Sequence, residues 1–225
     1  MKDLFNSYCV CINLFDNKVS ILSNKMNINT YNIYIDKTRD IDFILKEMIK
    51  TSAEKIPFSF FRSKIVILVS DYITINELDQ IYEIAYKNGK NKFREIISLN
   101  YGASIIGAFG NWNRSIYLVQ INDQIFGFAG CAGEMITKMI YFNSSNTIDY
   151  MINTITNEIN EEKYDELKMK IKNIDINSLW NKNEILISFN YDYYYNKKIE
   201  NIKNNYIPDI LNVGLIKYAK NILQN

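Results

Sequence analysis

Lys64-Ile-Val-Ile-Leu-Val-Ser70 is the stretch of sequence that decides the fold. Its near-continuous run of apolar, mostly β-branched residues is typical of a strand buried on both faces of a parallel sheet. Thr74 and Glu77 follow at the spacing of a capping box, which predicts a helix that starts directly after the strand. Gly89 is placed to end that helix, since glycine closes many helices. The stretch therefore predicts a strand followed at once by a helix.

Similar elements lie on both sides of this stretch. Before it, Tyr8–Phe15 and Lys18–Leu22 indicate a hairpin, and Asn32–Ile35 indicates a third strand. The stripe of apolar residues from Ile41 to Ile49 indicates an amphipathic helix capped by Asp40. After it come a strand over Arg94–Leu99 and a small-residue helix over Gly102–Phe109. This alternation of strands and helices favours a parallel α/β layer.

The pattern restarts after the polar, turn-prone stretch Gly110–Asn113. The first element predicted next is a hairpin of Ser115–Ile121 and Gln124–Ala129. It is followed by a helix over Glu134–Phe142, a helix capped by Thr147, a helix over Glu161–Lys172 and a strand over Glu184–Phe189. Pro208 opens a last helix, 208–223, at the first helical position, which proline favours. We therefore expect two α/β halves, residues 1–112 and 113–225, with the last helix closing the fold.

Composition excludes several classes of function. The 225 residues have a net charge of +1, so no overall field attracts nucleic acid. The chain has no histidine, which excludes Ser-His-Asp and Cys-His catalytic groups and removes the commonest metal ligand. Cys9, Cys11 and Cys131 are interpreted as buried, reduced thiols. Without a signal-like start or a membrane-spanning apolar run, a cytoplasmic location is expected.

Three stretches resemble a known family. Lys64–Thr74 looks like the strand and turn of MreB, which end in Pro-Ser-Gly-Ile-Thr, and Ala103–Ala108 is similar to that family's Ala-Ala-Ala-Ile-Gly-Ala. Asp209–Ala219 looks like the helix that closes the MreB fold. The chain thus resembles the actin-like ATPase superfamily, and within it the MreB bacterial actins. The resemblance implies an α/β, actin-like (ribonuclease H-like) fold of duplicated halves, with the upper subdomains largely missing because the chain is short.

The same resemblance implies four motifs that hold ATP, and the sequence departs from each. Where the family has Asp-Leu-Gly-Thr, this chain has Asn13, Leu14, Phe15 and Asp16. Where the family has Asp-Ile-Gly-Gly-Gly-Thr, it has Gln120, Ile121, Asn122, Asp123 and Gln124. The acid that positions water corresponds to Asn100 and its neighbours, and the adenosine loop to Ser188, Phe189, Asn190 and Tyr191. One missing preorganised group costs about a hundredfold in rate. We therefore expect a pseudo-ATPase with no enzyme activity beyond, at most, weak residual ATP turnover.

The resulting hypothesis is a degenerate actin-like or MreB-like scaffold of the cytoskeleton, linked to cell shape, that binds itself or a protein partner. The alternatives are a divergent filament-forming ATPase of the plasmid-segregation type and a regulatory module related to chaperone-type ATPase domains. No cofactor is expected, and ATP with Mg²⁺ belongs only to the ATPase alternative. Asp16 and Asp123 are interpreted as turn residues and not as metal ligands. Membrane contact through Leu4 and Phe5 is expected to be weak and peripheral at most.

A further expectation concerns the nucleotide cleft that the resemblance implies. Phe15, Phe189 and Tyr191 match positions at the phosphate and adenosine sites, so they are predicted to fill the cleft and hold one closed form. The aromatic run Tyr191–Tyr195 has two readings that stay open. It is either an aromatic surface patch that binds a partner or a segment that covers the nucleotide cleft implied by the resemblance.

Overall fold

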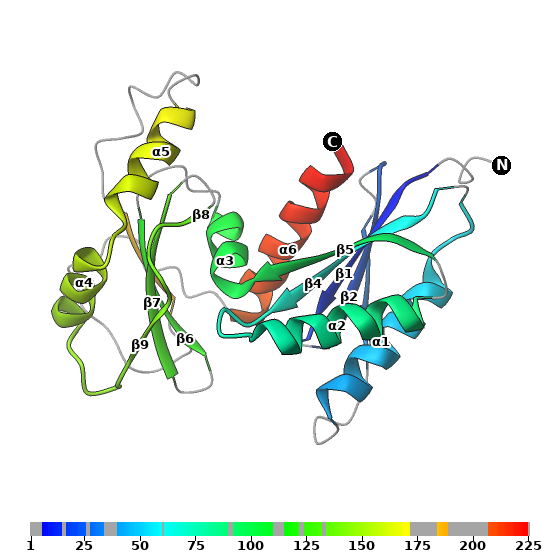
Figure 1. Cartoon of the computed structure of the whole chain (residues 1–225), viewed down its shortest axis with the longest axis horizontal. Helices are drawn as coiled ribbons and strands as arrows, with labels where there is room; N and C mark the ends of the chain where they lie inside the picture. Colours follow the sequence, from blue (N-terminus) through cyan, green and yellow to red (C-terminus); the bar gives the residue numbers. More distant parts are fainter. Residues whose placement is uncertain are drawn as a thin grey trace. The chain divides into compact units, whose positions relative to one another are not determined.

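The computed structural model describes residues 6–14, 17–25, 28–33, 40–59, 61–89, 92–109, 115–121, 124–131, 134–171, 184–188 and 207–224. Its chain forms two compact units, Met1–Ser104 with Leu211–Asn225, and Ile105–Ile210. Each unit contains a five-stranded sheet with helices packed on it (Figure 1). The expected mixed α/β fold with two sheet-bearing parts is therefore confirmed.

The sheet of the first unit combines an antiparallel hairpin with parallel strands. Its strands are β1 (Tyr8–Asn13), β2 (Lys18–Ser23), β3 (Ile28–Asn32), β4 (Ser63–Val69) and β5 (Phe93–Asn100). Their spatial order is β3-β2-β1-β4-β5. β2 runs antiparallel to both neighbours, whereas β1, β4 and β5 are parallel. β3 begins four residues before the strand expected at Asn32, because its alternating polar residues gave little hydrophobic signal.

Helices cover both faces of this sheet (Figure 1). α1 (Ile41–Lys55) and α2 (Ile75–Asn88) pack against one face, where alternate residues of β1 and β4 join Leu45, Met48 and Ile81 in a single core cluster. On the other face, the Sγ atom of Cys11 lies 3.9 Å from the carbonyl oxygen of Leu215 in α6 (Ile207–Gln224). Strands covered on both faces have near-continuous apolar runs, and β1 has no exposed residue, with only Asn13 polar at its end.

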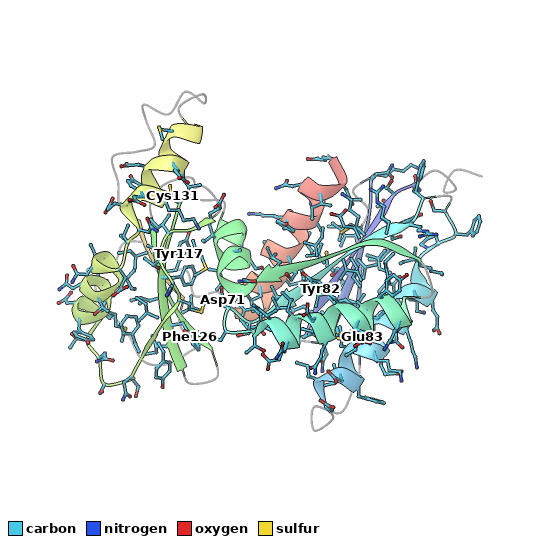
Figure 2. The ribbon with its side chains drawn as sticks, viewed as in Figure 1. Asp71, Tyr82, Glu83, Tyr117, Phe126 and Cys131 are labelled. Atoms are coloured by element: carbon cyan, nitrogen blue, oxygen red, sulfur yellow. The ribbon has the colours of Figure 1, made fainter. Side chains whose placement is uncertain are left out.

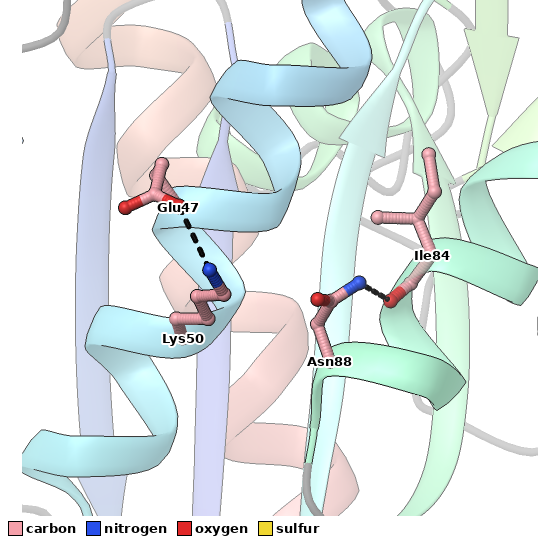
Figure 3. A network of polar contacts seen from close by, with 4 residues as sticks. All are labelled: Glu47, Lys50, Ile84 and Asn88. Carbon is pink, nitrogen blue, oxygen red and sulfur yellow. Dashed lines mark hydrogen bonds and ion pairs between the residues drawn. The ribbon is translucent and has the colours of Figure 1, made fainter.

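The helix ends are stabilised as the sequence predicted. The Thr74 Oγ1 atom accepts a hydrogen bond from the Glu77 N–H group at 3.3 Å, and a Glu77 carboxylate oxygen accepts one from the Thr74 N–H group at 2.8 Å. This capping box starts α2, and Gly89 ends it. Figure 3 shows the Asn88 amide donating to the Ile84 carbonyl at 2.8 Å in the last turn of α2, and a Lys50–Glu47 ion pair of 3.2 Å on α1.

The last helix packs on the first unit, although the sequence analysis grouped it with the second half. The Ser104 hydroxyl in α3 (Tyr101–Phe109) donates a hydrogen bond of 2.7 Å to the Leu211 carbonyl oxygen of α6. Gly214 lets the two backbones approach, since a Cβ atom there would lie 1.8 Å from the Ser104 carbonyl oxygen. Sequence proximity gave no information about this long-range contact.

The second unit is built on a hairpin with short added strands. β6 (Ser115–Ile121) pairs antiparallel with β7 (Gln124–Cys131), and β10 (Glu184–Ser188) pairs parallel with β6. β8 (Glu134–Met135) and β9 (Ile140–Phe142) both pair with β7. α4 (Ile148–Asn157) and α5 (Glu161–Ile171) contribute Met151, Ile155 and Leu167 to the core.

The helix expected over Glu134–Phe142 is wrong, because this segment forms β8 and β9. The Ile136 N–H group donates to the Ala129 carbonyl oxygen at 2.8 Å, and the Thr137 hydroxyl accepts from the Ala129 N–H group at 2.9 Å. These bonds to β7 replace the local bonds of a helix. Pairing with a neighbouring strand therefore overrode the helical pattern of a short segment.

Candidate functional site

The parallel strands of the first unit end at one edge of the sheet. β1 ends at Asn13, β5 ends at Asn100, and Asp71 follows β4 by two residues. Parallel sheets bind ligands at the edge where the carboxyl ends of their strands meet. We call Asn13, Asp71, Asn100 and Gly102 the carboxyl-edge site. All four belong to the first unit.

Asp71 is the centre of this site. Its carboxylate accepts a hydrogen bond of 3.0 Å from the N–H group of Gly102, in the first turn of α3. Figure 2 marks the position of Asp71 in the first unit. A side-chain hydrogen bond with Asn100 also stabilises the charged form of the carboxyl group. The first N–H groups of a helix have no partner within the helix and favour negative charge. Asp71 therefore caps α3 from a separate loop.

The loop that bears Asp71 is held by its own hydrogen bonds. The Ser70 Oγ atom accepts from the Tyr72 N–H group at 3.2 Å, and the Ile73 N–H group donates to the Ser70 carbonyl oxygen at 3.3 Å. The capping box at Thr74 follows directly. The short polar side chain of serine thus forms a local turn, and the turn directs the chain from β4 into α2 with Asp71 beside α3.

Burial dominates the electrostatics of the site. Loss of hydration raises the pKa of Asp71 above the usual carboxyl value, and the hydrogen bonds from Gly102 and Asn100 only partly oppose this. Burial also raises the pKa of the Tyr101 and Tyr72 hydroxyls, and the negative charge of Asp71 adds to the rise. The site is a partly dehydrated carboxyl group with two neighbouring phenols.

The raised pKa of Asp71 predicts a particular pH dependence of stability. A carboxyl group with a higher pKa in the folded state binds protons more readily when folded, so acid favours folding through it. The free energy of unfolding of the wild type, relative to Asp71→Asn, should therefore rise as pH falls through the raised pKa. The rise should be complete below the ordinary carboxyl value of about 3.9. Urea unfolding of both proteins between neutral pH and about pH 4 measures it.

Asp79→Asn, which changes an exposed carboxyl group on α2, is the matched control for that experiment. The pH trend of Asp71→Asn is read against this variant, which makes the same Asp-to-Asn change on the protein surface. A stability difference between wild type and Asp71→Asn that falls towards acid pH would mean that hydrogen bonds outweigh burial at Asp71.

The described residues include four of the predicted nucleotide-site positions. Asn13 is fully buried at the end of β1, and Asn100 is exposed at the end of β5 on the same sheet edge. Gln120 lies in β6 opposite Ile125, and Ser188 ends β10 opposite Val119. Because β6 and β10 are parallel, these two backbone positions lie near one edge of the second sheet. The other predicted positions lie outside the described residues: Phe15, Asp16, Asn122, Asp123, Phe189, Asn190 and Tyr191.

Asp71 was not among the predicted site residues. In the resemblance it stands for the serine of Pro-Ser-Gly-Ile-Thr, so it attracted no attention as an acid. A usable signal was present, because an acidic residue two positions after a largely buried strand lies at the edge where parallel sheets bind ligands. The cysteine interpretation is confirmed, since Cys9, Cys11 and Cys131 are all buried and form no disulfide.

The carboxyl-edge site does not suit a phosphate with its metal ion. A phosphate needs unoccupied backbone N–H groups at a helix N-terminus, whereas Asp71 already accepts from Gly102 and adds negative charge there. Asn13 supplies a neutral amide where the resemblance implies a carboxylate. Among the described residues, no group of three or more His, Cys, Asp or Glu side chains is arranged to hold a metal ion.

A second surface feature of the first unit is a groove of about 470 Å³ between α1 and α2. Its lining residues are Asp42, Phe43, Lys46, Glu83, Ile84, Lys87 and Asn88. Lys87 and Glu83 form an ion pair across one turn of α2. The two signs of charge balance along the groove, so the lining selects neither an anion nor a cation.

Among the described residues, no helix combines the length and apolar character needed to cross a bilayer.

Comparison with solved structures gives distant likenesses. MreB5 of Spiroplasma citri bound to ADP has 10% identity and a TM-score of 0.43, with 61% of this chain and 52% of that chain covered. A protein of unknown function with an actin-like ATPase fold from Bacteroides thetaiotaomicron has 10% identity and a TM-score of 0.43, with 84% of both chains covered. MamK, in a double helical filament, has 8% identity and a TM-score of 0.43, with 62% of this chain and 55% of that chain covered.

These likenesses concern the fold, and they include the MreB type that the sequence resemblance had named. The chain spans about half the length of MreB5 and MamK. No protein-family model matches the sequence, and no curated protein sequence matches it.

Proposed function

We propose that this chain is an actin-like scaffold of the cytoskeleton that acts by binding itself or a protein partner and does not hydrolyse ATP. One observation supports the proposal above others. The Asp71 carboxylate accepts a hydrogen bond from the N–H group of Gly102 at the start of α3, at the sheet edge where a parallel α/β sheet would hold a phosphate.

The physical reason is competition for one position. A phosphate near the first turn of α3 would meet a carboxylate instead of unpaired N–H groups, and two like charges that close repel each other. The neutral amide of Asn13 at the end of β1 supplies no carboxylate to hold the hydrated metal that accompanies ATP. The four departures from the nucleotide motifs agree with this reading of the described residues.

Loss of nucleotide binding changes how such a protein can act. Only a ligand that binds two conformations with different affinity shifts the balance between them. Without phosphate contacts, ATP has no means of switching the fold, so the scaffold would present its binding surfaces constantly. The three buried cysteines, none in a disulfide, suit a reducing compartment, and the proposal places the scaffold in the cytoplasm. A net charge of +1 gives no reason to expect a nucleic-acid partner.

The test is calorimetric titration of the full chain with ATP and MgCl₂, together with a phosphate-release assay. We expect no dissociation constant tighter than about 1 mM, which corresponds to only about −4 kcal/mol. Phosphate release should match that of a buffer blank. Melting temperature, measured on the same samples, shows that the protein is folded. A micromolar dissociation constant would contradict the proposal.

A divergent filament-forming ATPase is the second candidate, and Asp71 is the observation in its favour. A partly buried carboxyl group with a raised pKa at a ligand-binding edge is the kind of group that serves as a general base. The two candidates differ in the effect of Asp71→Asn. Under the second candidate, turnover is measurable and drops by about a hundredfold or more in Asp71→Asn. Electron microscopy with and without ATP then shows whether filaments depend on nucleotide.

A further inference from the structure

β3 is the outermost strand on one side of the sheet in the first unit. This lateral edge is distinct from the carboxyl edge, where the parallel strands end. Among the described strands β3 pairs only with β2. Ile28 is 39% exposed, and Asn29, Thr30 and Asn32 are exposed as well. Successive residues of a strand point to opposite faces of a sheet. Ile28, Thr30 and Asn32 therefore share one face and are exposed, whereas Tyr31 on the other face is partly buried against the core cluster.

The hydrogen bonds of β2 and β3 determine which backbone groups of β3 face outward. The Ile33 N–H group donates to the Asn17 carbonyl oxygen at 2.9 Å, on the β2 side. Backbone groups alternate between the two sides along an antiparallel strand. Asn29 and Tyr31 therefore direct their N–H and C=O groups towards β2, whereas Ile28, Thr30 and Asn32 direct theirs to the open edge.

The two edges of the same sheet are built differently. β5, the opposite edge, has exposed Arg94 and Glu95, and its pairing with β4 shifts register at Ser63 and Lys64. Charges and register irregularities are devices by which proteins prevent edge strands from pairing with other chains. β3 reads Ile-Asn-Thr-Tyr-Asn, without charge or proline, and its pairing with β2 is continuous. One edge is thus protected, and the other is open to pairing.

We propose that β3 pairs antiparallel with β3 of a second copy of this chain, about a two-fold axis at Thr30. This inference rests on the proposed function, since it names the surface by which the scaffold binds itself. With the axis at Thr30, that residue faces its own copy, and Ile28 faces Asn32 of the partner. The outward backbone groups then form about six hydrogen bonds.

A second copy suits this edge better than another partner because the edge is complementary to itself. A two-fold axis sets each residue of β3 against a residue of the same strand. Threonine opposite threonine is a favourable cross-strand pair, and no like charges meet in this register. A ladder of five residues is small compared with the roughly 800 Å² per partner of a stable interface. The association is therefore concentration-dependent and weak.

The first test is sedimentation velocity of the full chain over a range of concentrations. Thr30→Lys sets two like charges opposite each other, and Thr30→Pro removes a backbone N–H group that faces outward. Both variants also lose the hydrogen bond of 3.0 Å between the Thr30 and Ser20 hydroxyls, so their stability must be measured alongside. Asn153→Lys adds the same charge at an exposed position of α4 and is the matched control. We expect dimerisation at least about tenfold weaker in both Thr30 variants and unchanged in the control. Melting temperatures report whether each variant is folded.

The second test reads the register directly. Thr30→Cys places a thiol opposite its own copy, and the native cysteines are buried, so oxidation acts on the introduced thiol. We expect a disulfide-linked dimer in Thr30→Cys and little in Asn153→Cys. Equal cross-linking of both variants, or self-association that Thr30→Lys leaves unchanged, would overturn the β3 interface while leaving the scaffold proposal intact. Tight ATP binding would contradict the scaffold proposal and leave the β3 interface standing.

Discussion

Replacing Gly214 by alanine should lower the free energy of unfolding by about 2 kcal/mol. The new Cβ atom would lie 1.8 Å from the carbonyl oxygen of Ser104 and 2.7 Å from its Oγ atom. The obstacle is largely backbone, so α3 and α6 must move apart. That shift also strains the hydrogen bond of 2.7 Å between Ser104 and the Leu211 carbonyl. The better helix propensity of alanine, about 1 kcal/mol, offsets only part of the cost.

Urea unfolding of Gly214→Ala measures this effect, with Val213→Ala as the matched control. Val213 is the neighbouring residue of α6 and is 45% exposed, so its truncation tests a change in the same helix without the close contact. The control should be nearly neutral. If Gly214→Ala is as stable as Val213→Ala, the two helices are not packed as closely as the structure has them.

Replacing Phe128 by alanine should cost about 3–5 kcal/mol, the usual loss for a buried phenylalanine. Phe128 is fully buried in β7, and its ring stacks on that of Tyr117 in β6, with ring centroids 5.0 Å apart. The variant loses the apolar area of the ring and leaves a cavity beside Tyr117. The surroundings cannot collapse readily, because both residues lie in a hydrogen-bonded hairpin.

Phe126→Ala is the matched control, because it removes the same side chain from the same strand. Phe126 lies two residues earlier and is only half-buried, with an edge-to-face contact to Tyr141 at 6.0 Å between ring centroids. Its loss should lower the melting temperature by clearly less than the loss of Phe128. Equal effects of the two substitutions would contradict the burial difference between them.

Much of the fold was predictable because its signals are local. The apolar run of β4, the capping box at Thr74 and the closing Gly89 lie within one stretch of chain, and the structure confirms the strand and the helix there. Asp40 caps α1 and Thr147 caps α4 as predicted. Side-chain hydrogen bonds to the first turn of a helix involve residues two or three positions apart, so the sequence alone contains them.

The errors occurred where distant residues compete with local preference. Glu134–Phe142 has an apolar pattern compatible with a helix, but its backbone bonds to β7 instead. β3 was placed too late in the chain, because four of its five residues are exposed and it lacks the apolar alternation of a half-buried strand. In both cases the decisive partner is another strand.

The candidate site divides in the same way. The sequence analysis placed candidate site residues at the ends of β1 and β5, and Asn13 and Asn100 lie at the same carboxyl edge of the sheet. It did not predict Asp71, whose role depends on an N–H group 31 residues away in α3. Its raised pKa is likewise a result of burial, which no local pattern of residues reveals.

The sequence by itself determined the order of strands and helices from β1 to α3, the helix caps and the absence of histidine chemistry. Each of these depends on residue identity or on spacings of a few residues. Only the tertiary structure decided that α6 packs on the first unit, that Asp71 caps α3 and that β3 is left as an open edge. These features depend on which distant surfaces meet, and that choice is made by the burial of apolar area over the whole chain.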